Sequence, residues 1–317
     1  MRNARLTRRD ALKSGVAAAA GVILARPLAA IAQDLFELPL ITKPIPSTGE
    51  ALPVIGVGTN AYSVEGEEAL APIREVLERL PQLGGKVIDT ARVYGRSEQV
   101  IGELVEAIGN RDRLFLATKT PIRGDVSDAE GTLAVSFEAL RTDVIDLMQI
   151  HNLHGIPELM PAFERAKEAG RIRYIGISTS TDGQYDGILD AMRRYPLDFV
   201  QIDYSIDNRS AADRILPEAQ ERGIAVIANT PFGGRFNAAS LFGRVRDVAL
   251  PDFAAEFDAS SWAQVFLKYV VSHPAVTVAI PGTTRLDHLL DNQGAARGRL
   301  PDAALRAEIE RFWDSLG

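Results

Sequence analysis

The chain has 317 residues, of which 46% are hydrophobic and 24% charged, so it can bury a core as one large domain or two small ones. It contains no cysteine, which excludes disulfides, thiolate metal sites and a cysteine nucleophile. The formal net charge is −7, and because the first 32 residues carry six basic and one acidic side chain, the remainder carries −12. This acidic body argues against nonspecific nucleic-acid binding and against binding to an anionic membrane surface.

The first 32 residues have the features of an export signal. The pair Arg8 and Arg9 precedes an apolar run over 14–25, which is too short to span a membrane comfortably, and a small-x-small cleavage site follows at 30–32. This order resembles a twin-arginine signal, which implies export of the folded protein by the Tat machinery to the periplasm or beyond, without a stable membrane anchor. A basic amphipathic helix is the alternative. We treat 33–317 as the folded domain.

After the signal, the predicted elements alternate regularly. Short β-prone pieces around Ser47-Thr48-Gly49 predict a hairpin within 33–53. Eight nearly continuous apolar runs, typical of parallel strands buried on both faces, follow at 54–59, 86–90, 114–119, 145–151, 173–178, 199–204, 225–229 and 276–281. Amphipathic segments predict helices at 67–80, 97–108, 128–141, 157–169, 183–194, 212–222, 260–272 and 286–296, and a terminal helix at 302–316.

About eight strand–helix units predict an α/β fold, a closed (β/α)8 TIM barrel with an N-terminal β-hairpin and an extra C-terminal helix. A doubly wound sheet is the alternative, but no Gly-x-Gly-x-x-Gly follows an early strand. No linker divides the chain after residue 33. The stretch 232–258 lacks clear periodicity, which predicts a loop at the mouth of the barrel.

Polar residues stand at or just past the ends of three neighbouring strands. Asp89 ends the second strand, Tyr94 lies in the loop after it, Lys119 ends the third and His151 ends the fourth. Because adjacent strands lie about 4.8 Å apart, these side chains can converge. Such a set could polarise a carbonyl and protonate its oxygen, because a lysine ammonium eases proton release from a phenol and an aspartate holds the lysine charged. The hydride must come from a cofactor.

Simpler interpretations exist for each of these residues. The aspartate could pair with Arg92, the tyrosine could be a packed aromatic, and the lysine could be solvated. His151 and His154 lie three residues apart and, with Asp89, allow a metal-dependent hydrolase, although a glycine and a proline break any helix there. The helix after the tyrosine loop has Ser97 as a plausible N-cap.

The run Asp-Thr-Ala-x-x-Tyr-Gly-x-Ser-Glu over 89–98 resembles the signature of the aldo-keto reductases, and the resemblance extends over about 52–296. Asp89, Tyr94, Lys119 and His151 fall on that family's tetrad in the same order. The segments 145–151 and 171–178 also match. The resemblance implies a reductase of an aldehyde or ketone that uses NADPH, or less often NADH, with Tyr94 as the proton donor.

The resemblance also implies where the cofactor and the substrate bind. The expected cofactor contacts lie in four segments: Gly58, Thr59 and Asn60; Ser178, Thr179 and Gln201; Asn229, Pro231, Phe232 and Gly233; and Gly282, Thr283, Arg285, Asp291 and Asn292. Tyr62 and Asn152 are the expected contacts with a small carbonyl substrate. No metal is expected.

Three features depart from the family pattern. Thr179 replaces an asparagine, and Asn229 stands where an aromatic usually stacks on the nicotinamide. Gly282 and His288 stand where basic residues often bind the 2′-phosphate, so Arg285 becomes the candidate for that contact. The changes at Thr179 and Asn229 motivate a second hypothesis, a nicotinamide-nucleotide-binding sensor or partner subunit without efficient catalysis.

Overall fold

The computed structural model describes residues 37–234 and 240–317, so the predicted export signal lies outside the described residues. Strands β1 (Thr42–Pro44) and β2 (Ala51–Pro53) form the predicted antiparallel hairpin. The predicted parallel strands follow as β3 (Val57–Gly58), β4 (Val87–Asp89), β5 (Phe115–Lys119), β6 (Ile145–His151), β7 (Ile172–Ser178), β8 (Phe199–Asp203), β9 (Ala225–Asn229) and β10 (Val276–Ala279).

These strands close into a barrel. They pair in consecutive order from β3 to β10, each parallel to its neighbour. The first and last strands then meet, because Gly58 N–H donates to the Pro281 carbonyl at 3.0 Å and Ala279 N–H donates to the Val54 carbonyl at 2.9 Å. A doubly wound sheet would reverse its strand order and keep two open edges. The predicted (β/α)8 fold is therefore confirmed.

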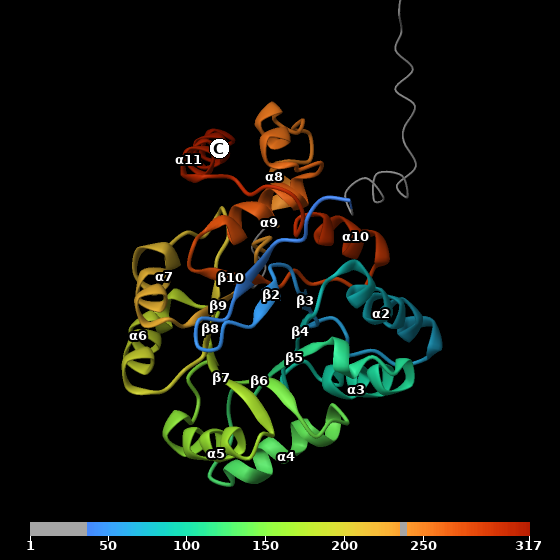
Figure 1. Cartoon of the computed structure of the whole chain (residues 1–317), viewed down its shortest axis with the longest axis vertical. Helices are drawn as coiled ribbons and strands as arrows, with labels where there is room; N and C mark the ends of the chain where they lie inside the picture. The colour runs from blue at the N-terminus through green and yellow to red at the C-terminus, as the bar shows by residue number, and fades with distance from the viewer. Residues whose placement is uncertain (1–36, 235–239) are drawn as a thin grey trace, which may run out of the picture.

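The helices surround the barrel on the outside (Figure 1). They are α2 (Glu67–Arg79), α3 (Ser97–Ile108), α4 (Ala129–Ala139), α5 (Ile156–Glu168), α6 (Tyr185–Arg194), α7 (Ala211–Arg222), α8 (Leu241–Arg244), α9 (Trp262–Ser272), α10 (Leu286–Gly294) and α11 (Ala303–Ser315). Short 3₁₀ turns occur at Leu80–Leu83, Arg111–Arg113, Asp182–Gln184 and Asp252–Phe257. Within the described residues, none of these helices is both long enough and apolar enough to cross a bilayer.

The interior of the barrel is filled at the end where the strands begin. Ile45 and Leu52 of the hairpin are fully buried and pack with inward-facing residues of the strands. Among those, Phe115, Tyr174 and Phe199 have ring centroids 5.5–6.0 Å apart. In Figure 1 the hairpin crosses this end of the barrel. The opposite end, where the strands finish, is left for a site.

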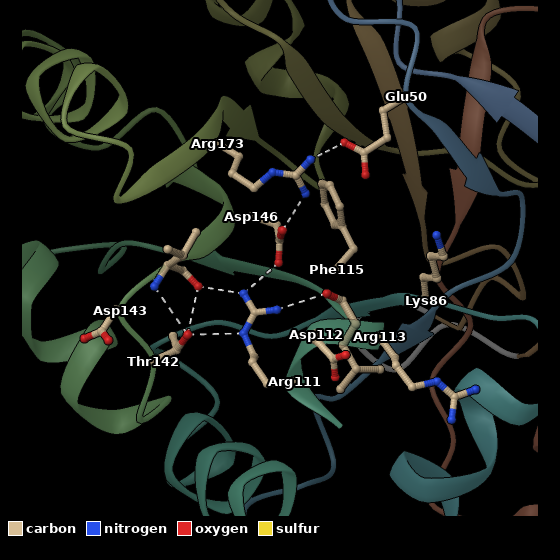
Figure 2. A pocket seen from close by; sticks show the side chains of 12 residues that line it. Glu50, Lys86, Arg111, Asp112, Arg113, Phe115, Thr142, Asp143, Asp146 and Arg173 are labelled. Carbon is tan, nitrogen blue, oxygen red and sulfur yellow. Dashed lines mark hydrogen bonds and ion pairs between the residues drawn. The ribbon is translucent and has the colours of Figure 1, made fainter. Parts of the chain in front are cut away.

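Charged groups hold the strand starts in register. The buried Asp146 carboxylate accepts from Leu116 N–H of β5 and from Arg111, both at 2.8 Å, and from Arg173 at 2.7 Å. Arg173 also pairs with Glu50 of the hairpin. Figure 2 shows this chain of contacts around a cavity of about 430 Å³. Both arginines are already paired with acidic side chains of the protein. We therefore interpret the residues around this cavity as stabilising the fold and not as binding a ligand.

Candidate active site

A second cavity, of about 580 Å³, opens at the carboxyl ends of the strands. The structure brings most of the predicted residues to its wall: Gly58, Thr59, Asn60, Asp89, Tyr94, Lys119, His151, Asn152, Ser178, Thr179, Gln201, Asn229, Pro231, Phe232, Gly233 and Gly282. They come from segments far apart in the sequence, and each stands at or just past the end of a strand. This is the end of a (β/α)8 barrel where active sites form.

A buried ion pair forms the floor of the cavity. Lys119 Nζ donates to Asp89 Oδ1 at 2.5 Å and to the Thr90 carbonyl at 2.8 Å, and both charged side chains are 2% exposed. The amides of Gln149 and Gln201 donate to the same carboxylate at 3.3 Å each. Burial raises the pKa of Asp89, whereas Lys119 and the two amides oppose this rise. Such a pair is stable only because its remaining hydrogen-bonding capacity is satisfied.

Tyr94 lies beside the lysine of this pair. Its ring centroid is 5.5 Å from Lys119 Nζ, and its side chain is half-buried in the cavity wall. The loop that carries it begins with a turn in which Tyr94 N–H donates to the Ala91 carbonyl at 3.0 Å. Gly95 follows with φ at 61°, and a Cβ there would collide with Ser63 Oγ. The glycine therefore lets the loop place the tyrosine ring beside the ammonium.

His151 is held in its neutral form. Burial and the nearby Lys119 charge lower its pKa from 6.5 to about 3. Its Nδ1 atom is buried and has no hydrogen-bond partner among the described residues. The ring of His154 does not line this cavity, and its Nε2 hydrogen-bonds the Gly124 carbonyl at 2.9 Å. No cluster of three or more metal-ligating side chains occurs within 37–234 and 240–317.

The opposite wall presents groups suited to a carboxamide. Ser178 Oγ and Gln201 Oε1 are buried without a partner in the described part of the chain, so they offer one donor and one acceptor. Thr179 is already engaged, because its Oγ1 donates to Gln184 Oε1 at 2.6 Å and its carbonyl accepts from Asn229 Nδ2 at 3.0 Å. This wall fits a nicotinamide carboxamide through Ser178 and Gln201.

Residues 54–312 match the sequence profile of the Aldo/keto reductase family, which is more than half of the chain. The chain belongs to this family. It is 28% identical over 272 residues to aldo-keto reductase str7 of Strobilurus tenacellus, covering 74% of this chain and 79% of that protein. It is 26% identical over 309 residues to aldo-keto reductase yakc [NADP(+)] of Schizosaccharomyces pombe, covering 84% of this chain and 90% of that protein.

Solved structures agree with the barrel. An aldo-keto reductase from Klebsiella pneumoniae in complex with NADPH superposes with a TM-score of 0.71 at 26% identity, covering 87% of this chain and 96% of that one. An aldo/keto reductase from the same organism with NADP and acetate gives a TM-score of 0.67 at 25% identity, covering 84% and 93%.

Some predicted site residues of this aldo/keto reductase lie away from the cavity. Tyr62 is fully buried, burial raises its pKa, and its hydroxyl donates to the Thr283 carbonyl at 3.0 Å. It therefore supports the loop around Thr283 from behind, a loop that the sequence predicts to bind the cofactor. Arg285 is exposed and pairs with Asp287, with Nε 3.0 Å from Oδ1. Asp291 accepts from Ser261 and Gln264 at 2.8 Å, and Asn292 is buried.

Two apolar residues of the cavity wall were not predicted. They are Val93, which is 45% exposed, and Ile122. Loop residues have no periodicity, so no sequence signal identified them. The predicted N-cap was wrong, because Arg96 occupies that position and makes no side-chain cap. Ser97 is instead buried in the first turn, with Oγ 2.9 Å from Thr90 Oγ1 and 3.1 Å from the Thr59 carbonyl.

Proposed function

We propose that this member of the family reduces an aldehyde or ketone by hydride transfer from NADPH, with Tyr94 as the proton donor. The observation that carries this proposal is the buried Lys119–Asp89 pair beside the Tyr94 ring. A phenol is a weak acid at neutral pH, and a fixed ammonium beside it stabilises the phenolate. The paired aspartate supplies the counter-charge for this buried lysine.

Each residue has a separate role in the proposed carbonyl reduction. NADPH, when bound, supplies the hydride, which no side chain can provide. Tyr94 Oη gives its proton to the carbonyl oxygen, and Lys119 stabilises the resulting phenolate. The neutral His151 ring donates a hydrogen bond to the same oxygen and orients the carbonyl. Asn152 lies beside it in the wall, and we propose it as a substrate contact.

We propose NADPH as the cofactor because the relatives named above carry NADP(+) or NADPH in their names. Ser178 and Gln201 would hold the carboxamide. Arg285 would contact the 2′-phosphate and would share its guanidinium with Asp287. Measuring the Kd values of NADPH and NADH by fluorescence tests this assignment, because Arg285→Ala should weaken only NADPH binding.

The turnover test is direct. Protein lacking residues 1–32 should oxidise NADPH in the presence of simple aldehydes. Tyr94→Phe should lower the rate by about a thousandfold, because general acid catalysis contributes factors of this order, while NADPH binding measured by fluorescence stays intact. Full turnover in Tyr94→Phe would exclude the proton-donor role.

A nucleotide-binding sensor or partner subunit is the second candidate. The observation that favours it concerns Asn229, where the family pattern predicts an aromatic ring that stacks on the nicotinamide. The Asn229 side chain donates instead to the Thr179 carbonyl, so this position has no ring to stack. Tight NADPH binding without turnover across a broad panel of aldehydes and ketones would favour this candidate.

We also propose that residues 1–32 export the folded enzyme through the twin-arginine pathway to the periplasm or beyond. The support is the arginine pair, the short apolar run and the cleavage site. Fusing these residues to a reporter that folds in the cytoplasm tests the proposal. Export should require the pathway and should be lost when Arg8 and Arg9 are both changed to lysine.

A further inference from the structure

The first turn of α3 places an acidic side chain inside the protein. Glu98 follows the Tyr94 loop directly, and it is 3% exposed. An acid in a first helical turn usually stays in water, where it complements the helix dipole. A buried carboxylate is costly unless it is hydrogen-bonded and faces positive charge. The contacts of the Glu98 carboxylate therefore have to explain why it is buried.

Glu98 is anchored on the outer face of β5. Thr118 Oγ1 donates to Glu98 Oε1 at 2.6 Å, and Ser136 of α4 hydrogen-bonds the same carboxyl. The charged groups that interact with it electrostatically are Arg92 of the tyrosine loop and Lys119 of β5. Burial raises its pKa, and all four of these neighbours oppose the rise.

Thr118 and Lys119 are consecutive residues of one strand, so their side chains point to opposite faces. Lys119 points inward to Asp89, and Thr118 points outward to Glu98. The end of β5 is thus bound by a carboxylate on each face, Asp89 on the inner face and Glu98 on the outer face. The Arg92 guanidinium adds a second connection, because its Nη1 donates to the Thr132 carbonyl of α4 at 3.0 Å.

We infer that Glu98 is a positioning residue for the reduction: it fixes the end of β5 through Thr118, so that Lys119 stays between Asp89 and Tyr94. This inference rests on the proposed function. A displaced ammonium would stabilise the phenolate less, and a misplacement of about 1 Å can cost a factor of up to a hundred in rate. Neither Thr118 nor Glu98 lines the cavity, so the affinity for NADPH should not change.

The test compares Glu98→Gln with Thr118→Val, which weaken or remove the Thr118–Glu98 hydrogen bond from its two sides. Glu98→Gln replaces the charged acceptor of Thr118 with a neutral amide oxygen and so weakens the bond, whereas Thr118→Val removes the donor. The readouts are the single-turnover rate of NADPH oxidation with 4-nitrobenzaldehyde, the KM for that aldehyde and the Kd of NADPH. We expect the single-turnover rate to fall about tenfold in each variant with both constants unchanged, and the double variant to be no slower than the slower single one.

Asp146→Asn is the matched control. Asp146 is an equally buried carboxylate that binds the same strand at its other end, through Leu116 N–H at 2.8 Å. This variant should lower the melting temperature and leave the single-turnover rate unchanged. If Glu98→Gln and Thr118→Val also lose only thermal stability, the positioning role is overturned while the proposed function stands. If the parent protein shows no turnover, the proposed function fails first.

Discussion

Replacing Asp89 by asparagine should destabilise the protein strongly. Three donors converge on the carboxylate: Lys119 Nζ at 2.5 Å, and Gln149 Nε2 and Gln201 Nε2 at 3.3 Å each. An asparagine would turn its own NH₂ group toward at least one of them and leave the lysine charge without a partner. Because both charged side chains are 2% exposed, water cannot compensate, and the expected loss is about 3–5 kcal/mol.

The assay is urea unfolding at pH 7 of protein lacking residues 1–32, with the melting temperature as a second measure. Asp89→Asn should lower the melting temperature by about 5–8 °C. The double variant Asp89→Asn/Lys119→Met removes the stranded charge, so it should recover most of the loss. If the single variant lost less than about 1 kcal/mol, Lys119 would not be a buried ammonium, and the account of Tyr94 would fail with it.

Three more predictions concern the loop, the barrel and pH. Gly95→Ala should lower kcat more than stability, because the added Cβ meets Ser63 Oγ and displaces the Tyr94 loop; steady-state kinetics and thermal melting separate the two effects. Asp198→Ala should reduce the free energy of unfolding in urea by about 1–3 kcal/mol with kcat unchanged. The Asp198 carboxylate accepts a hydrogen bond from the buried Ile175 N–H at 2.9 Å, and the substitution leaves that N–H without its acceptor. His151 has a pKa of about 3 in the folded protein against 6.5 in the unfolded chain, so it favours folding above pH 6.5, and this contribution is lost as pH falls toward 3. His151→Asn should flatten the pH dependence of the unfolding free energy in that window by up to about 1.4 kcal/mol per pH unit.

The barrel could be predicted because its strands are buried on both faces. A strand such as 145–151 is mostly apolar along its length, whereas the helices show the 3.6-residue period. The alternation of strands and helices can therefore be recognised in the sequence. The four catalytic candidates were predictable because parallel strands bring their carboxyl ends to one face. Strand identity alone therefore placed Asp89, Lys119 and His151 at the same cavity.

The remaining site features depend on tertiary contacts that no local pattern encodes. Ser97 has the residue type of an N-cap, but hydroxyl partners on Thr59 and Thr90 draw it inward. Tyr62 follows the predicted cofactor segment 58–60 in the sequence, yet its hydroxyl donates to a carbonyl 221 residues away. Arg285 is paired with Asp287, two positions along the chain. Only the folded chain decides which side of a loop faces the cavity.

The contact between β3 and β10 has a consequence for biosynthesis. The barrel seam joins residues near 55 to residues near 280, so about the first nine-tenths of the chain must be synthesised before the seam can form. Until then β3 is an unprotected sheet edge, the kind of surface on which nascent chains associate wrongly. Fragments that stop before Val276 should therefore aggregate, and a transport route that accepts only finished domains would have to wait for the last strand.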